Sequence, residues 1–583
     1  MAIKKQWFAA IVYVVVPLAT WYYGYTLYLD SIASLYRAGP ELPAPPRRYT
    51  APADGGEASD PNQLDDGLDS VITFIHATDI HISKYSYTGQ YIHFLHFLST
   101  AVPLISPRFV AATGDLTDGK DELRLASHQQ FEEWSAYQAA LRRSEIIDRN
   151  NGTFWFDQRG NHDCFNVPGW TSASNYYRDY GAIKRRGYHF DIEELFGKYS
   201  FIATDGCPDM GVGRPLNFFG YLDATAMDRL ESQLARARHN NHTIMLNHYP
   251  TSIMVYGKTS GGKSFSELTK DVSLFLCGHL HLLKGGIGAQ LQTYHPERFL
   301  ELELGDMKDH GLYRVYAIDH DLISFADVQL PLSPIPYPNP QSWLKSPLSI
   351  QKVDPVPHPP VVLVTNPKDS RYIIPNHEPL ERINRSTFIR ILVWADTAVD
   401  SVHAFIDGVP LTEPATYRGL NMTVAERWKT TANNRHYTPL WVIPWDPAQY
   451  EDGREHTLVV VATDRDGKVG EQQVLFRLDG RRIPLNNTWR GGWIMNTDFQ
   501  RFFKQLALFE YFASFFTIFW MPHLVLWLHY WRGLTASSLP QALGLAPYDP
   551  VQHQYQQEQQ QEEDEDEEEV EDASSDSGHN TVN

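Results

Sequence analysis

Cysteine is scarce in this sequence, and basic residues are too few to offset its acidic ones. Only 3 of the 583 residues are cysteine, so neither a disulfide framework nor a Cys-x-x-Cys zinc motif is expected. One disulfide can form among Cys164, Cys207 and Cys277, with one cysteine left over. Cysteine content therefore does not decide whether the protein lies in a reducing or an oxidising compartment. The formal net charge is −20, of which 12 acidic residues and no Lys or Arg lie after residue 555, leaving −8 on the rest. No nucleic-acid partner is therefore expected.

Two long runs lack charged residues altogether. The first, 7–29, follows Lys4 and Lys5 and is long enough to span a bilayer, with a cleaved signal peptide as the alternative. The second, 511–531, contains one proline, which a bilayer helix tolerates, with a buried amphipathic helix as the alternative. We therefore expect an N-terminal membrane anchor over 1–30, a C-terminal transmembrane segment over 505–531, and the lipid bilayer as a partner.

The chain between these runs is expected to lie in the lumen or outside the cell. Two lysines before the first run favour a cytosolic N-terminus, although the basic residues before the second run conflict with that orientation. Five Asn-x-Ser/Thr triplets occur between the runs and favour a glycoprotein: Asn151, Asn241, Asn384, Asn421 and Asn486.

Composition divides the chain into two folded domains and three irregular segments. Residues 31–70 are rich in Pro, Gly and Asp and form a linker, and ten prolines make 331–360 a stiff extended linker. Residues 532–583 form an acidic tail expected to be disordered. The domains are expected over 71–330 and 361–480.

The first domain alternates apolar runs with amphipathic stretches, which predicts an α/β fold. We expect strands at Val71–His76, Arg108–Thr113, Thr153–Gln158, Tyr199–Thr204, His242–Leu246 and Ser273–Cys277, and helices at Asp121–Ile147 and Asp223–His239. The second domain has short β-rich runs separated by Asp-Gly turns, which predicts an all-β immunoglobulin-like sandwich without the usual cysteine pair.

Five polar clusters follow, or lie near, the predicted strands of the first domain. They are Asp79-Ile-His81, Gly114-Asp115-Leu-Thr-Asp118, Gly160-Asn161-His162-Asp163, Asn247-His248 and Gly278-His279-Leu-His281. A single cluster of this kind is usually a turn, but loops at one edge of a sheet can converge on one site. Carboxylate, amide and imidazole donors suit two divalent metal ions, and they fit Mn, Fe or Zn better than Ca.

This order of motifs resembles the calcineurin-like metallophosphoesterases, whose pattern is D-x-H, G-D-x-x-D, G-N-H-[DE], an isolated His and G-H-x-H. The resemblance implies a four-layer α/β/β/α sandwich with a dinuclear metal site. One metal would take Asp79, His81, Asp115 and His281. The other would take Asp115, Asn161, His248 and His279, with Asp115 bridging.

The resemblance also implies hydrolysis of a phosphomonoester or phosphodiester substrate by a hydroxide activated between the metals. His162 is expected to be the general acid or a clamp on the phosphate, with Asp163 fixing its tautomer and raising its pKa. The whole architecture is similar to the transmembrane protein 62 family. The rival hypothesis is a catalytically inert receptor or scaffold that acts through its immunoglobulin-like domain, which a missing metal ligand would have favoured.

Overall fold

Two β-sheets that pack face to face carry the predicted site. The computed structural model describes residues 64–86, 89–214, 216–282, 290–295, 299–332, 347–350, 352–374, 376–431, 437–502, 505 and 523–530. The first sheet has five strands in the order β13 (Leu322–Gln329), β12 (Leu312–Asp319), β1 (Val71–Ala77), β2 (Val110–Ala112) and β3 (Trp155–Asp157). The second has six in the order β10 (Gln292–Tyr294), β11 (Leu300–Glu303), β9 (Leu274–Cys277), β7 (His242–Leu246), β5 (Gly197–Ala203) and β4 (Tyr188–Glu194).

Both sheets are mixed: the parallel strands form one side of the first sheet and the middle of the second. In the first sheet β1, β2 and β3 are parallel and β12 is antiparallel to β1. In the second, β5, β7, β9 and β11 are parallel, and β4 and β10 are antiparallel at the edges. The carboxyl ends of the parallel strands of each sheet therefore lie at one edge, where connecting loops can share a site.

The buried strands pack differently on their two faces because side chains alternate along a strand. In β1, Ile72 and Phe74 belong to the core between the sheets, whereas Val71 and Ile75 belong to the core under the first helical layer. Phe74 stacks on Phe109 and Tyr316 at ring distances of 5.0 and 4.7 Å. Continuous apolar runs thus mark strands that are covered on both sides.

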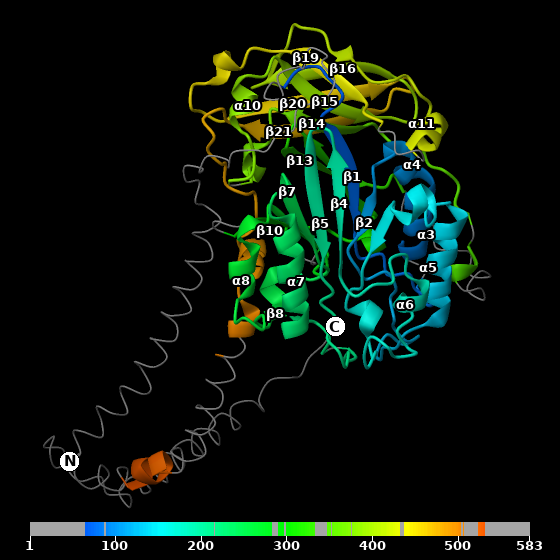
Figure 1. Cartoon of the computed structure of the whole chain (residues 1–583), viewed down its shortest axis with the longest axis vertical. Coiled ribbons are helices and arrows are strands. Elements are labelled where there is room, and N and C mark those ends of the chain that lie inside the picture. Colours follow the sequence, from blue (N-terminus) through cyan, green and yellow to red (C-terminus); the bar gives the residue numbers. More distant parts are fainter. Residues whose placement is uncertain are drawn as a thin grey trace, which may run out of the picture. The chain divides into compact units, whose positions relative to one another are not determined.

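Helices cover the outer face of each sheet, which completes the expected four layers (Figure 1). The first sheet is covered by α3 (Gln90–His96), the π-helical turn η2 (Phe97–Ala101), α4 (Val102–Ile105), α5 (Phe131–Arg143) and α6 (Tyr177–Tyr180). The second is covered by α7 (Ala224–Ala237) and α8 (Phe265–Leu268). Short elements complete the domain: η3 (Arg149–Gly152), η4 (His162–Cys164), β6 (Gly220–Leu222), η5 (Thr251–Ile253), β8 (Met254–Tyr256), η6 (Thr269–Asp271) and α9 (Met307–His310).

The predicted helix over Asp121–Ile147 is wrong in its first ten residues. Helix α5 begins only at Phe131. The preceding segment is a hairpin loop, in which Lys120 and Ser127 form an antiparallel β-bridge and the Asp121 amide donates to the Ala126 carbonyl. The other predicted helix is confirmed as α7, whose N-terminal cap is the Asp223 carboxylate.

The second domain is a sandwich of two four-stranded sheets. One has the order β14 (Val361–Asn366), β15 (Phe388–Trp394), β19 (Leu440–Pro444) and β18 (Thr416–Tyr417), and the other β17 (Val409–Pro410), β16 (Val399–Ile406), β20 (His456–Asp464) and β21 (Val469–Phe476). Alternate residues of β15 and β20 fill the core between them. Its short helical elements are η9 (Ser370–Tyr372), α10 (Glu381–Asn384), α11 (Val424–Thr431) and η10 (Pro447–Tyr450), whereas η8 (Pro347–Ser349) packs against α5 and α12 (Trp489–Asn496) against β10 of the first domain.

A buried arginine joins the two domains, which belong to one compact unit. The Arg390 guanidinium on β15 donates to both carboxylate oxygens of Asp319 on β12, at 2.8 and 3.1 Å. It also donates to the carbonyls of Asp65 and Gly67, so the end of the predicted 31–70 linker is held in place. Both charged side chains of the pair are fully buried.

Most of the residues expected in the membrane lie outside the described part of the chain. These are 7–29 and, in the second run, 511–522 and 531. A helix covers 523–530. Within the described ranges, no helix combines the length and the apolar character needed to cross a bilayer.

Candidate metal centre

The predicted ligand residues meet at the carboxyl ends of the parallel strands. Asp79 and His81 follow β1, Asp115 follows β2, Asn161 follows β3, His248 follows β7, and His279 and His281 follow β9. All seven come from loops at this edge, and six are buried, whereas the His281 side chain is 24% exposed. Segments 200 residues apart in sequence thus form one site.

The first group of donors is Asp79, His81, Asp115 and His281, whose ligand atoms all lie within 4.8 Å of one another. His281 Nε2 lies 2.8 Å from Asp79 Oδ1 and 3.1 Å from His81 Nε2. His81 Nε2 in turn lies 3.3 Å from Asp115 Oδ2. This set is the one that the resemblance assigns to the first metal.

The second group shares Asp115 through its other oxygen. Asp115 Oδ1 lies 3.3 Å from His248 Nε2, which is 3.1 Å from both Asn161 Oδ1 and His279 Nδ1. Asn161 Oδ1 and His279 Nδ1 are 2.9 Å apart. One carboxylate therefore faces both groups, as a bridging ligand between two cations must.

Among the described residues, one carboxylate oxygen of the site has no hydrogen-bond donor and is available to a cation. Asp79 Oδ1 is buried and accepts no hydrogen bond within the described chain, although His281 Nε2 is only 2.8 Å away. The other oxygen, Oδ2, accepts from Thr78 Oγ1 at 2.8 Å and from the His279 amide at 3.0 Å. Because a buried polar atom without a partner is costly, Oδ1 has the environment expected of a metal ligand.

Hydrogen bonds to the far side of the imidazoles fix which nitrogen faces the centre. His248 Nδ1 donates to the Thr113 carbonyl at 2.9 Å, so the proton of the neutral ring is on Nδ1 and Nε2 offers a lone pair. His81 Nδ1 lies 3.3 Å from Asp118 Oδ1, which places a carboxylate behind this ring as well. Asp118 thus lies on the side of His81 away from the other donors, where its carboxylate can orient the ring.

The backbone is strained at the same residues. Asp79, His81, Asp115, His279 and His281 all have φ between 49° and 84°, the left-handed region that non-glycine residues avoid. Each such residue costs on the order of 1–3 kcal/mol, and such strain clusters at functional sites. The motif glycine Gly160 allows this crowding, because a Cβ there would lie 2.2 Å from Asp115 Oδ1.

Charge in the site is balanced between carboxylates and imidazoles. Burial opposes ionisation of Asp115, but the nearby imidazoles, His248 foremost, hold the pKa of its carboxyl well below the usual range. Burial would lower the pKa of His248, yet Asp115, together with Asp79 and the Thr113 carbonyl, outweighs burial and raises it to about 9. Burial, followed by His248, lowers the pKa of His279 to about 3. A cation at this position would replace the proton on His248, so metal and proton compete for the same nitrogen.

His162 contacts the centre but belongs to neither ligand group. Its Nδ1 donates to the Asp118 carbonyl at 2.6 Å, and its Nε2 lies 3.8 Å from Asp115 Oδ2. Burial lowers the pKa of His162 well below its usual value, although Asp115 acts in the opposite direction. Nε2 is thus the nitrogen presented toward the bridging carboxylate.

The expected contact between Asp163 and the His162 ring is replaced by another arrangement. The Asp163 carboxylate accepts from the amides of Gly160, Leu116 and Thr117 and from the Thr117 hydroxyl. Because η4 turns this side chain into the protein, it fastens the loop after β3 to the loop after β2. Burial, reinforced by Asp115, raises the pKa of Asp163 to about 7.

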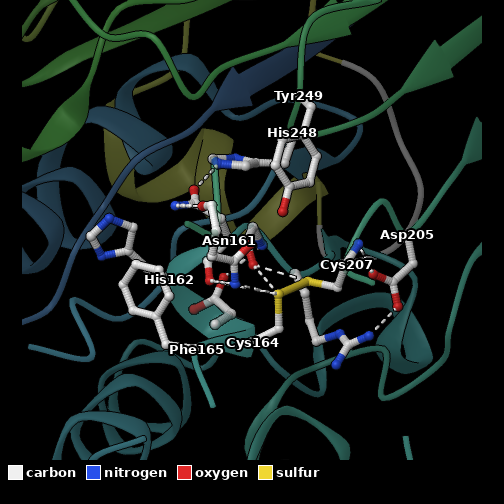
Figure 2. The surroundings of a disulfide bond; sticks show 12 residues. Asn161, His162, Cys164, Phe165, Asp205, Cys207, His248 and Tyr249 are labelled. Atoms are coloured by element: carbon white, nitrogen blue, oxygen red, sulfur yellow. Dashed lines mark hydrogen bonds and ion pairs between the residues drawn. A yellow bond between two sulfur atoms is a disulfide. The ribbon is translucent and has the colours of Figure 1, made fainter. Parts of the chain in front are cut away.

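A disulfide lies directly behind the Asn161 loop, as Figure 2 shows. Cys164 is bonded to Cys207, and Cys207 Sγ lies 3.1 Å from the Gly160 carbonyl. Asn217 accepts a hydrogen bond from Asn161 Nδ2 through its carbonyl at 3.0 Å. The sequence did not determine which cysteines form the disulfide, and Asn217 belongs to no motif. Both contacts could therefore be identified only from the structure.

Comparisons with known proteins divide the chain in the same way. Residues 72–283 match the calcineurin-like phosphoesterase family, and residues 356–482 match the TMEM62 Ig-like domain. The chain is 34% identical to mouse transmembrane protein 62 over 435 residues, which cover 74% of this chain and 58% of that protein. It is 23% identical to an Arabidopsis thaliana protein named as a putative metallophosphoesterase, over 78% of this chain and 64% of that one.

The chain therefore spans less than two thirds of either relative. Among solved structures, it is similar to the purple acid phosphatase PPD1 from yellow lupin seeds. That similarity has a TM-score of 0.28 and 11% identity, and covers 45% of this chain and 52% of that one.

Proposed function

Because the chain contains a calcineurin-like phosphoesterase domain followed by a TMEM62 Ig-like domain, we propose that it is a metal-dependent phosphoesterase that binds two divalent ions. The observation that carries this proposal is the position of Asp115, whose two oxygens face two separate groups of buried donors. The donor set supports Mn, Fe or Zn, because it combines imidazole nitrogen with carboxylate and amide oxygen and contains no thiol. An inert receptor is not favoured, because no predicted ligand is missing.

In this proposal each residue has a defined task. Asp79, His81 and His281 would hold one ion, Asn161, His248 and His279 would hold the other, and Asp115 would contact both. Such ions neutralise charge on a phosphoester and make bound water a stronger nucleophile. Thr113 and Asp118 keep His248 and His81 turned toward the ions.

His162 has the position of a proton donor to the leaving group. The Asp118 carbonyl accepts a hydrogen bond from Nδ1, so one proton of the ring is on Nδ1. A second proton, on Nε2, makes the ring an imidazolium. Burial disfavours this cation, whereas the negative charge of a phosphoester next to it would favour it. Where the phosphoester offsets burial in this way, His162 can pass its Nε2 proton to the departing alkoxide.

The decisive experiment measures metal content and turnover together. The full chain should contain about two divalent ions and hydrolyse 4-nitrophenyl phosphate or bis(4-nitrophenyl) phosphate. Asp115→Asn should lower both readouts, with a loss of turnover on the order of a thousandfold or more. Asp228→Asn on α7 is the matched control and should change neither. Wild-type protein with less than one ion per chain, or Asp115→Asn with full turnover, would overturn the proposal.

We further propose that this domain faces an oxidising compartment, the lumen or the cell exterior. Disulfides persist in such compartments and are rare in the cytosol. Of the predicted glycosylation sites, Asn151, Asn421 and Asn486 are exposed. The similarity to a protein named as transmembrane supports membrane association.

A further inference from the structure

Five exposed apolar side chains gather on two loops beside the metal centre. Leu123 and Leu125 lie at the tip of the hairpin loop 120–127, and Met210, Leu216 and Phe218 lie in the segments 207–214 and 216–219. The first four are between 75 and 79% exposed, and Phe218 is 43% exposed. We call these five residues the apolar rim. Scattered apolar residues are normal on a surface, but a group of large ones marks a binding surface.

Hydrogen bonds hold the two loops together. The Arg214 amide donates to Ser127 Oγ at 3.1 Å, and the Arg214 guanidinium donates to the Arg124 carbonyl at 2.9 Å. At the base, the Gly211 amide donates to the Val167 carbonyl at 2.8 Å, next to the disulfide. The rim is therefore built on fixed backbone.

The rim continues directly into the metal centre. The Phe218 ring lies 4.9 Å from the His279 ring, and the neighbouring Asn217 carbonyl accepts from Asn161. On the other loop, Lys120 lies two residues after Asp118, which contacts both His81 and His162. A molecule with its phosphate at the metal centre would therefore extend over the rim.

One basic side chain, Lys120, lies beside the centre and at the base of the loop that carries Leu123 and Leu125. Lys120 Nζ is 2.6 Å from Asp118 Oδ1 and only 11% exposed. Burial lowers the pKa of Lys120, whereas the neighbouring Asp118 raises it. A cation next to a surface of large apolar side chains suits a ligand that is both anionic and hydrophobic.

We propose that the apolar rim binds the hydrocarbon part of an anionic lipid phosphoester whose phosphate lies at the metal centre. The proposal rests on the proposed function for the position of the phosphate, and it adds the class of substrate. A soluble sugar or nucleotide ester would leave the rim in water, whereas an alkyl chain would cover it. Burying one leucine side chain corresponds to about a tenfold change in affinity or more.

The test compares decyl phosphate with inorganic phosphate as ligands of the full chain. Binding is measured by calorimetry in the presence of Mn²⁺, below the micelle concentration of decyl phosphate. Decyl phosphate should bind at least tenfold more tightly than phosphate. Leu123→Ser and Leu216→Ser should each weaken decyl phosphate binding about tenfold and leave phosphate binding unchanged. Leu195→Ser is the control, because Leu195 is 82% exposed in the turn between β4 and β5, at the opposite end of β5 from the site.

Turnover separates this inference from the proposed function. Methyl and decyl 4-nitrophenyl phosphate share a leaving group, and only the decyl diester should lose kcat/KM in the two rim variants. If neither diester nor 4-nitrophenyl phosphate is hydrolysed, the proposed function fails while the binding comparison still decides the inference. Equal affinity for decyl phosphate and phosphate, or an equal loss in Leu195→Ser, would overturn the lipid proposal.

Discussion

Removal of the Cys164–Cys207 disulfide should destabilise the phosphoesterase domain. The bridge joins residues 43 apart, and closing a loop of that length lowers the entropy of the unfolded chain by an amount worth about 4 kcal/mol at 25 °C. Measured losses usually fall below this figure because the unfolded chain keeps some structure. We therefore expect the free energy of unfolding to fall by about 2–4 kcal/mol in Cys164→Ala/Cys207→Ala.

The same change should weaken the second group of metal donors more than the first. Cys164 ends η4, three residues after Asn161, and Asn217, ten residues after Cys207, accepts a hydrogen bond from Asn161. Without the bridge these loops can separate, so Asn161 loses its fixed distance to His248. Losing a support of this kind typically lowers metal affinity 10–100-fold, or by about 1.4–2.7 kcal/mol.

Three measurements check this prediction, and the free cysteine supplies the control. Thiol titration in denaturant should find one thiol in untreated protein and three after reduction, since Cys277 is buried and unpaired. Urea unfolding and metal analysis should then separate the double variant from Cys277→Ala, which leaves the bridge intact. Three thiols in untreated protein, or equal unfolding midpoints for the double variant and Cys277→Ala, would refute the reasoning.

Two further substitutions test the domain contact and the crowding at the centre. Arg390→Met should lower the free energy of unfolding by about 3–5 kcal/mol, measured by urea unfolding, because it leaves the Asp319 carboxylate buried without its cation. An unchanged midpoint would contradict this. Gly160→Ala should lower metal content and turnover on the order of a hundredfold, because its Cβ would meet Asp115, whereas Gly169→Ala meets no atom within 4 Å and should keep both. Retention of two ions in Gly160→Ala would show that Asp115 can move.

Most strands could be predicted from local patterns, and the residues of the candidate site from an order of motifs that resembles the calcineurin-like metallophosphoesterases. Val71–Ile75 is a continuous apolar run, and it forms a strand buried on both faces. The short motifs at 79–81 and 160–163 follow such strands, so a parallel sheet brings them to one edge. The backbone conformation at those positions could not be predicted, since no sequence feature of Asp79 or His81 indicates a positive φ.

The errors have physical causes as well. The helix predicted from Asp121 begins only at Phe131, because the chain turns back on itself between Lys120 and Ser127. Leu123 and Leu125 lie in this loop and are exposed. A helical pattern read from Phe131 onward does not show where the helix begins, since the turn before it depends on contacts with other loops.

Asp163 illustrates how adjacency in sequence misleads. It follows His162 directly, which suggested that it orients the ring, but consecutive residues in the tight turn η4 point in different directions. The carbonyl of Asp118 takes that task, and Asp163 instead accepts four hydrogen bonds from two loops. With the disulfide on the other side of η4, the turn is fastened at both ends, and Asn161 and His162 are carried by it. The geometry of the candidate metal centre on this side therefore depends on residues outside both donor groups.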